Sequence, residues 1–265
     1  MQPWNIAHRG GAQLSPENTL TAFGRALGKG ADGVEFDVQL SRDGVAVIHH
    51  DFRLNPGYAR LRGAWLENAG PRIKDLTVEE LHEYNIGLPR PDSAYAREHP
   101  LLEDANGEGI PILETAVRIL KIYPRVETMV ELKCDTSADS SDPIVLADTV
   151  YDVIAAADFL LSTVFVGFDW RALARIRQRD PGAACWFTTD RLSGDARPVI
   201  DAVAAAGGQG WFPNFLDATP ENIAHARGKG LRIGAWTVND PADMRRLMTL
   251  DAICTDRPDL LAGLL

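Results

Sequence analysis

Cysteine is scarce in this sequence. The 265 residues include three, Cys134, Cys185 and Cys254, and no two of them form a CxxC pair. An odd and widely spaced set of this kind excludes a disulfide framework and a zinc ribbon. We expect the three thiols to be small apolar residues of a core.

A long apolar run and a leader segment are also lacking. The apolar stretch Val153–Leu161 is interrupted by Asp158, whereas about 20 apolar residues are needed to cross a bilayer. The first residues, Met1–Asn5, show no basic segment followed by an apolar one, which a secretory signal would require. We therefore expect a cytoplasmic protein without stable membrane insertion.

Positive charge is in deficit. The chain has 27 Lys and Arg against 37 Asp and Glu, which argues against a nucleic-acid-binding surface. No linker rich in Ser, Gly or Pro and no block of charge divides the sequence. A single α/β barrel commonly takes about 250 residues, so we expect residues 1–265 to form one domain. The sequence leaves the oligomeric state open.

Short apolar runs alternate with helical patterns, which is typical of an α/β fold. The predicted strands are Trp4–His8, Gly33–Val38, Val45–His49, Thr128–Lys133, Thr163–Phe168, Ala184–Thr188, Gly210–Pro213, Arg232–Thr237 and Ala252–Thr255. The predicted helices are Thr19–Gly28, Ile112–Tyr123, Pro143–Ala157, Trp170–Arg179, Arg197–Ala206, Pro220–Lys229, Pro241–Leu250 and Pro258–Leu264. Eight strands would close a TIM (β/α)8 barrel. One of the nine is therefore an extra strand, which the pattern does not identify.

The alternation fails between Asp51 and Ile110. This segment holds five prolines and one helical piece, Thr77–Tyr84, and it is too long for an ordinary barrel loop. We interpret approximately residues 51–111 as an insertion that leaves the barrel after His50-Asp51. At that place it would lie over the mouth of the barrel and shape substrate access.

Acidic residues occur in pairs on two predicted strands. Glu35 and Asp37 are two residues apart, so they face the same side, and Glu131 with Lys133 repeats this spacing. Carboxylates buried in a barrel must be neutralised, and a divalent cation does so with hard oxygen ligands. Glu35, Asp37 and Glu131 are thus candidate ligands for one Mg²⁺ or Ca²⁺, with Mn²⁺ as a further choice. The alternative is that they are exposed or paired with Lys or Arg.

Two histidines also follow predicted strands. Imidazole titrates near neutral pH, so His8 and His50 are the candidate acid and base. Each begins a turn that contains a charged neighbour, Arg9 in one case and Asp51 in the other. A structural role, the usual one for a lone strand histidine, is the weaker interpretation here.

Three further residues are candidates for substrate binding. Arg9 offers a planar fork for two phosphate oxygens, and Lys133 offers a point charge. Ion pairing with the acidic residues is the alternative for both, and it is compatible with phosphate binding. Trp236 ends a predicted strand, where its indole would form an apolar wall or belong to the core.

These residues fall in motifs that resemble those of the glycerophosphodiester phosphodiesterase family. In chain order the motifs are His8-Arg9-Gly10 with Pro16-Glu17-Asn18-Thr19, Glu35-x-Asp37, His50-Asp51, Glu131-Leu132-Lys133, Trp236-Thr237-Val238-Asn239 and Ile253-Cys254-Thr255-Asp256-Arg257-Pro258. Each motif is weak alone, but the ordered set covers nearly the whole chain and is specific.

The resemblance implies a TIM barrel that hydrolyses small glycerophosphodiesters to sn-glycerol 3-phosphate and an alcohol. The implied roles are metal ligation for Glu35, Asp37 and Glu131, acid/base catalysis for His8 and His50, phosphate contact for Arg9 and Lys133, and a place near the glycerol for Trp236. By similarity to phosphatidylinositol-specific phospholipases C, the glycerol 2-hydroxyl would attack and give a transient cyclic phosphate. Direct attack by water is the alternative.

Two departures from the family pattern concern the leaving alcohol. Many members follow His-Asp with Leu-x-Arg-Thr, where this chain has Phe52-Arg53-Leu54-Asn55-Pro56, and a common Ser-Phe pair is Gly167-Phe168 here. The preferred headgroup is therefore left open, as is the native metal. Two other functions compete: a lysophospholipase D-type phosphodiesterase for a lipid-chain substrate, and a non-catalytic phosphodiester-binding protein. The absence of a basic amphipathic stretch favours a small soluble diester.

Overall fold

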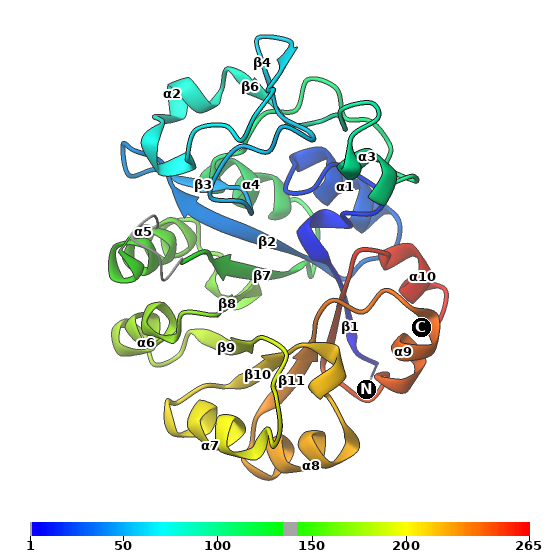
Figure 1. Cartoon of the computed structure of the whole chain (residues 1–265). Coiled ribbons are helices and arrows are strands. Elements are labelled where there is room, and N and C mark those ends of the chain that lie inside the picture. Colours follow the sequence, from blue (N-terminus) through cyan, green and yellow to red (C-terminus); the bar gives the residue numbers. More distant parts are fainter. Residues whose placement is uncertain (1, 135–141) are drawn as a thin grey trace.

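The strands close into a barrel (Figure 1). The structure is a computed structural model, and it describes residues 2–134 and 142–265. Eight parallel strands follow one another around the ring, and β1 pairs with both β2 and β12, which completes it. The eight are β1 (Trp4–Ala7), β2 (Gly33–Leu40), β7 (Glu127–Leu132), β8 (Thr163–Gly167), β9 (Ala184–Thr189), β10 (Gly210–Pro213), β11 (Arg232–Ala235) and β12 (Ala252–Thr255). The predicted TIM barrel is confirmed.

One of the nine predicted strands lies outside the ring. β3 (Ala46–Ile48) pairs antiparallel with β2. In the turn between them Gly44 N donates to Ser41 O at 3.0 Å, and Gly44 has a φ of +77°, which glycine adopts without steric cost. The candidate Val45–His49 is therefore the extra strand.

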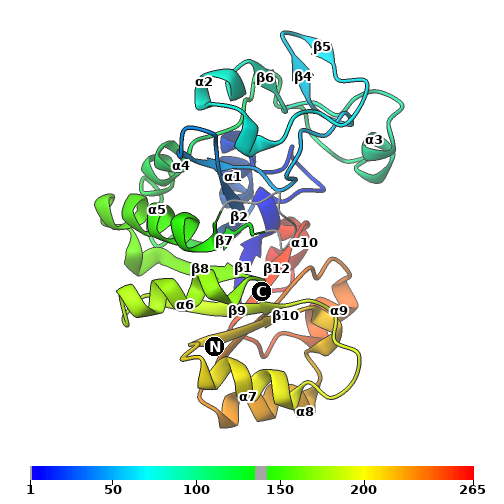
Figure 2. The same ribbon diagram turned by 60° about the vertical axis from the view of Figure 1, so that its left-hand side comes forward.

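Helices cover the outside of the ring (Figures 1 and 2). They are α1 (Leu20–Gly28), α4 (Leu113–Leu120), α5 (Pro143–Ala156), α6 (Trp170–Arg179), α7 (Arg197–Ala205), α8 (Pro220–Gly228), α9 (Pro241–Arg246) and α10 (Pro258–Ala262). Thr19 caps α1 and Asp169 caps α6, each by accepting a hydrogen bond from a backbone N–H of the first turn. α9 ends earlier than predicted, and Trp236 lies just beyond β11. None of the helices in these described ranges is long and apolar enough to cross a membrane.

Successive residues of each strand face two different cores. One apolar cluster fills the ring and includes Met129, Trp186 and Phe212, whereas the other lies between strands and helices and includes Phe165. Because side chains alternate along a strand, Glu131 shares the inner face with Met129. The same alternation therefore builds the core and directs the functional side chains.

The segment between β3 and α4 forms a small substructure beyond β3 (Figures 1 and 2). It contains β4 (Arg60–Leu61), β5 (Ala64–Trp65), β6 (Tyr84–Asn85), α2 (Val78–Leu81) and α3 (Ala94–Glu98). Its strands form their own sheet, in the order β5-β4-β6. Leu54 and Tyr58 pack in its apolar cluster together with Val47 of β3. The predicted helical piece Thr77–Tyr84 was too long, because Tyr84 belongs to β6, and strands of two residues show no alternation.

The cysteines are free thiols. Cys185 and Cys254 are buried and Cys134 is partly buried, so two of the three are core residues as expected. Burial raises the pKa of Cys185 to about 12, which keeps this thiol protonated at neutral pH.

Ile176 tests the packing of α6 on the barrel. Its side chain is fully buried in the outer core, so Ile176→Ala should leave a cavity and lower the free energy of unfolding by about 2–5 kcal/mol in urea denaturation. On the same helix, Arg171→Ala truncates an exposed side chain that pairs with Asp169 and should cost less than about 1 kcal/mol. Equal losses in the two variants would contradict the core position of Ile176.

Candidate active site

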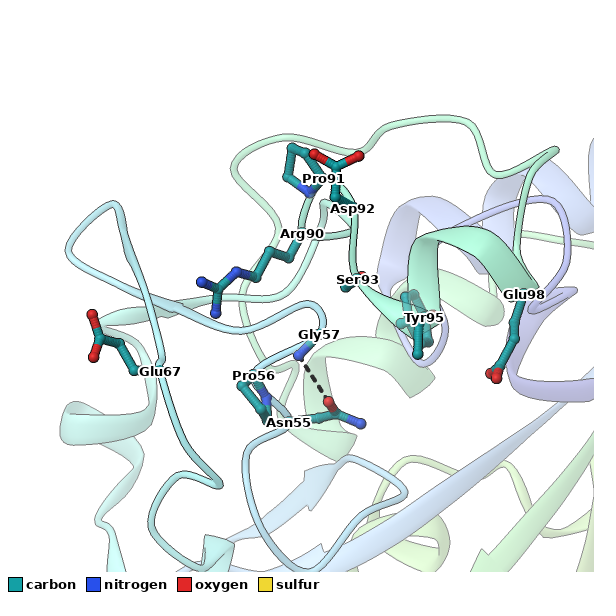
Figure 3. Close-up of a pocket in the computed structure, with 11 residues that line it drawn as sticks. Asn55, Pro56, Gly57, Glu67, Arg90, Pro91, Asp92, Ser93, Tyr95 and Glu98 are labelled. Carbon is teal, nitrogen blue, oxygen red and sulfur yellow. Dashed lines mark hydrogen bonds between the residues drawn. The ribbon is translucent and has the colours of Figure 1, made fainter.

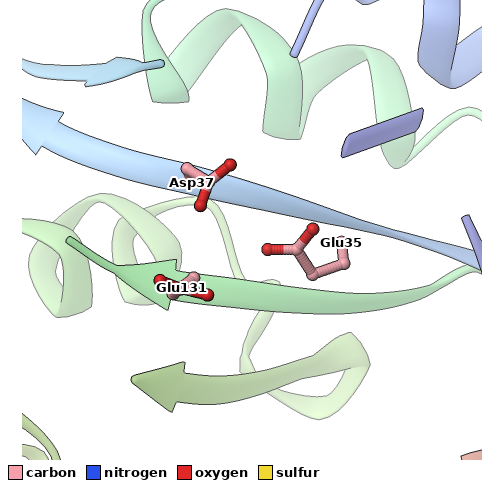
Figure 4. Close-up of side chains that lie close together, drawn as sticks. All are labelled: Glu35, Asp37 and Glu131. Carbon is pink, nitrogen blue, oxygen red and sulfur yellow. The ribbon is translucent and has the colours of Figure 1, made fainter. Parts of the chain in front are cut away.

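Three carboxylates from two neighbouring strands meet inside the barrel (Figure 4). Asp37 on β2 lies opposite Glu131 on β7 in the parallel register, and Glu35 shares the inner face with Asp37. One carboxylate oxygen of each residue lies within 4.8 Å of the other two. Glu35 and Asp37 are buried and Glu131 is partly buried. The fold thus brings together the residues selected from the sequence as metal ligands.

Glu35 has an oxygen that the protein leaves without a partner. Its Oε2 accepts a hydrogen bond from the backbone N of Arg9 at 3.0 Å, whereas the buried Oε1 has no hydrogen-bond partner among the described residues. Burial, and then the charges of Asp37 and Glu131, raise the pKa of Glu35 well above its ordinary value. A divalent cation would supply the missing partner and relieve the repulsion. The donor set of three carboxylates therefore fits a hard metal ion.

The pKa of Asp37 is shifted in the opposite direction from that of Glu35. Burial alone would raise its pKa, but the positive charges of His50, Arg9 and Lys133 outweigh burial and hold the pKa of Asp37 well below its ordinary value. The Asn18 side chain donates to Asp37 Oδ2 at 2.9 Å and accepts from the backbone N of Asp37 at 3.2 Å. Asp37 is therefore ionised and fixed in orientation.

Arg9 lies in a tight turn directly after β1. The turn, His8–Gly10, gives Arg9 a φ of +50° and Gly10 a φ of +81°, and a Cβ on Gly10 would lie 2.7 Å from an atom of α1. Arg9 Nη1 donates to Glu17 Oε1 at 3.0 Å, and its Nε lies 3.3 Å from Asp37 Oδ2. Burial would lower the pKa of Arg9, but the negative charges of Glu17 and Asp37 outweigh burial and raise that pKa above its ordinary value, so the guanidinium remains charged.

Lys133 reaches the same carboxylates from β7. Its Nζ donates to Glu131 Oε1 at 2.8 Å and lies 3.7 Å from Asp37 Oδ1. Burial would lower the pKa of Lys133, but the two carboxylates outweigh it and raise that pKa. Both Arg9 and Lys133 are therefore paired with acidic residues, which was the alternative considered from the sequence.

His8 is held by a carboxylate from the far end of the chain. Its Nδ1 lies 2.6 Å from Asp256 Oδ1, and its Nε2 lies 4.0 Å from Glu35 Oε2. The other oxygen of Asp256 accepts a hydrogen bond from Asn239 Nδ2 at 2.7 Å. Burial would raise the pKa of Asp256, but the contacts with His8 and Asn239 hold it below its ordinary value. Asp256 is thus an ionised partner that orients the imidazole.

His50 follows a strand that runs antiparallel to its neighbour in the sheet. From the sequence it was expected at the end of a strand like the others, but its strand, β3, lies outside the ring. The hairpin returns the chain to the level of Asp37, whose carbonyl accepts a hydrogen bond from His49 N at 2.9 Å. His50 Nδ1 lies 2.8 Å from Asp51 Oδ1. Gln39 Nε2 lies within 3.1 Å of the carbonyl oxygens of residues 49–51, which holds this loop in place.

An aromatic wall stands beside these charged groups. Trp236 is edge-on to Phe168, with ring centroids 5.3 Å apart, and its indole N–H donates to Phe212 O at 3.2 Å. A cavity of about 130 Å³ is lined by His8, Arg9, Glu35, His50, Glu131, Lys133, Phe168, Phe212 and Trp236. Every candidate site residue from the sequence therefore borders one space, except Asp37, which is buried next to Glu131.

The side chains that hold the candidate residues were not recognised from the sequence. Asp256 and Asn239 lie in motifs to which no role was assigned for these two residues, and Gln39 had no signal at all. His8 and Asp256 are 248 residues apart, and only the pairing of β1 with β12 brings them together. A spacing pattern along the chain does not reveal such a contact.

Known proteins resemble this chain over nearly its full length. The model of the glycerophosphoryl diester phosphodiesterase family matches residues 8–260. A glycerophosphodiester phosphodiesterase of Caldanaerobacter subterraneus is 26% identical, over 98% of this chain and 96% of its own. A solved structure from Silicibacter pomeroyi, provisionally named a glycerophosphoryl diester phosphodiesterase, is 30% identical with a TM-score of 0.88, over 98% of this chain and 92% of that one.

A further solved structure shares the fold at lower identity. An Oleispira antarctica phosphodiesterase, in complex with the product sn-glycerol-3-phosphate, has a TM-score of 0.79 at 23% identity, over 99% of this chain and 96% of that one. Since the family model extends over almost the entire barrel, from His8 to Leu260, this chain belongs to the glycerophosphoryl diester phosphodiesterase family.

Proposed function

We propose that this protein is a metal-dependent enzyme that hydrolyses a glycerophosphodiester to sn-glycerol 3-phosphate and an alcohol. The observation that carries the proposal is the cluster of Glu35, Asp37 and Glu131, because Glu35 and Glu131 line one cavity with two cations and two histidines and Asp37 lies directly beside Glu131. The names of the relatives, and the product bound to the Oleispira antarctica protein, support the same class of substrate.

Glu35, Asp37 and Glu131 would hold one divalent metal ion. Carboxylate oxygens favour Mg²⁺ or Ca²⁺, with Mn²⁺ as the alternative. When bound, the ion polarises the phosphoryl group and lowers the pKa of the attacking oxygen. Arg9 and Lys133, relieved of part of their pairing with the carboxylates, would donate to the phosphate oxygens and stabilise the negative charge that develops there.

His8 and His50 would exchange protons with the substrate through Nε2, because Nδ1 of each faces an aspartate. His8 Nε2 lies 4.0 Å from Glu35, one of the proposed metal ligands. Since the attacking oxygen would lie near the metal ion, His8 suits the base that takes its proton. Cavities of about 440 and 630 Å³ lie on the side of residues 51–111. This open space suits a leaving alcohol, so we assign His50 as the acid that protonates it.

The attacking group is the glycerol 2-hydroxyl or a water molecule. In the first route a cyclic phosphate forms and water then opens it, whereas in the second the diester is cleaved directly. The same two histidines serve both routes. Trp236 and Phe168 would pack against the glycerol carbons, since their rings form the apolar wall of the cavity.

The size of the central cavity suits the glycerol phosphate group of the substrate, since about 130 Å³ accommodates that group alone. A lysophospholipid carries the same group, so the preference for a soluble diester over the lipid-chain substrate of a lysophospholipase D-type enzyme rests on the sequence, which has no basic amphipathic stretch. We also infer that residues 51–111 are an insertion in one domain of residues 1–265. Val47 of β3 supports this inference, because it packs in the apolar cluster of that segment.

The proposed reaction is tested by release of sn-glycerol 3-phosphate from glycerophosphocholine and glycerophosphoethanolamine. Chelator-treated protein should be inactive, and Mg²⁺, Ca²⁺ or Mn²⁺ restored singly should return activity, because the carboxylates need the ion. No release from either diester with any of these ions would refute the proposal. Release from a lysophospholipid alone would favour the lipid-chain alternative.

Metal binding can be measured without turnover. A ligand that binds only the folded state at 100 times its Kd adds about 2.7 kcal/mol of stability, so the thermal midpoint of the apo-protein should rise with added Mg²⁺ or Ca²⁺. The rise should be lost in Glu131→Gln, which removes one ligand charge. Glu114→Gln, an exposed change on α4, should keep it. The same rise in both variants would exclude Glu131 as a ligand.

The two histidines can be distinguished by the leaving group. His50→Gln should lower kcat for glycerophosphocholine roughly 10²- to 10⁴-fold but lower it much less for a nitrophenyl diester, whose leaving group needs no protonation. His8→Gln should impair both substrates, because the attacking oxygen still needs a base. If His50→Gln is equally slow on both substrates, His50 is not the acid.

A further inference from the structure

The two histidines of the site are held in the same way. His8 Nδ1 lies 2.6 Å from Asp256 Oδ1, and Asn239 Nδ2 donates to Asp256 Oδ2 at 2.7 Å. His50 Nδ1 lies 2.8 Å from Asp51 Oδ1. In this second set Asp51 Oδ2 accepts from Asn55 Nδ2 at 3.2 Å. Each aspartate therefore uses one oxygen for a histidine and the other for an asparagine amide.

The orientation of each asparagine amide is set by a backbone N–H. Gly57 N donates to Asn55 Oδ1 at 2.8 Å (Figure 3), and Asp256 N donates to Asn239 Oδ1 at 2.9 Å. An amide whose oxygen accepts from the backbone must present its NH2 group elsewhere. In both sets the NH2 group faces the aspartate.

Asn55 differs from Asn239 in its place in the fold. It lies in the segment of residues 51–111, where its carbonyl also accepts hydrogen bonds from Tyr58 N and Ala59 N, at 3.2 and 2.8 Å. Tyr58 is buried in the apolar cluster of that segment. Asn55 is thus anchored by the segment that borders the site, rather than by a barrel strand.

Asp51 is more exposed than Asp256, so the hydrogen bond from the amide of Asn55 matters more for its orientation. The side chains of His50 and Asp51 are 30% and 39% exposed, against 17% and 16% for His8 and Asp256. A carboxylate that is more exposed has more freedom to rotate away from its histidine. Within the described residues, Asn55 is the side chain that donates to the second oxygen of Asp51.

We propose that Asn55 is a positioning residue for His50, which it orients through Asp51. The inference rests on the proposed function, because it requires His50 to act on the substrate. Asn55 also lines both cavities on this side, one of about 630 Å³ (Figure 3) and one of about 440 Å³. The segment of residues 51–111 therefore supplies part of the catalytic geometry as well as the surroundings of the leaving alcohol.

Asn55→Asp tests the NH2 group of Asn55, because it removes this donor and changes little else in the size of the side chain. The new side chain keeps an oxygen for Gly57 N but places a carboxylate oxygen against Asp51, so kcat should fall roughly ten- to a hundredfold. KM should stay within about twofold, since proton transfer is needed only in the transition state. Asn55→Ser, which can keep the turn but is too short to reach Asp51, should lower kcat in the same sense even if Asn55→Asp folds poorly.

Asn85→Asp is the matched control. Asn85 lies in the same segment, and its Oδ1 accepts from Gly87 N in the same two-residue turn, at 3.2 Å, but it does not contact Asp51. Its kcat should equal that of the unaltered enzyme. Thermal midpoints of all variants identify any loss that comes from unfolding alone.

A double-mutant cycle tests the path through Asp51. Asp51→Ala should lower kcat by itself, and adding Asn55→Ser should lower it no further, because Asn55 then has nothing to orient. An undiminished second loss would overturn the proposed path, as would a full kcat in both Asn55 variants of an active enzyme. Lack of turnover by the unaltered protein with every diester and metal would instead refute the proposed function, and this inference with it.

Discussion

Mutual repulsion among three carboxylates, two of them buried and one partly buried, is the constraint on which the rest of the site depends. Glu35, Asp37 and Glu131 share a space in which their oxygens approach within 4.8 Å, and burial deprives them of water. The two side-chain cations pair with Asp37 and Glu131, while one oxygen of Glu35 is left without a hydrogen-bond partner. The pKa values of the two buried carboxyl groups are therefore shifted in opposite directions: that of Asp37 is lowered and that of Glu35 is raised. A further cation would relieve this repulsion, and that expectation comes from the electrostatics of the fold and is independent of any motif.

Local patterns predicted which of these side chains share a strand face, and the fold brings them together. The spacing of Glu35 and Asp37 on one strand determines that they share a face, and the parallel register places Glu131 opposite Asp37. The apolar pattern of the strands was insufficient for His50, because over three residues of β3 it does not show which strand lies outside the ring, although the short link of residues 41–44 is typical of a tight turn. The antiparallel return nevertheless brings His50 to the same cavity, since the hairpin places His49 level with Asp37.

Long-range contacts and very short elements could not be predicted. His8 and Asp256 meet only because the ring closes between its first and last strands. β4, β5 and β6 have two residues each, which is too few for alternation to show. In that segment chain direction is set by turns and by burial of residues such as Tyr58, and neither leaves a periodic trace in the sequence.

The two sides of the site face different physical requirements. The side of His8 is built from barrel strands and the aromatic wall of Trp236 and Phe168, which suits the part of the substrate common to all glycerophosphodiesters. The side of His50 borders the segment of residues 51–111, which suits the alcohol that varies among them. If Asn55 orients His50 as proposed, the sequence of this segment cannot be adapted to a different alcohol without regard to His50. Any replacement must keep a donor to Asp51, so the shape of the alcohol site and the geometry of proton transfer are coupled through one side chain.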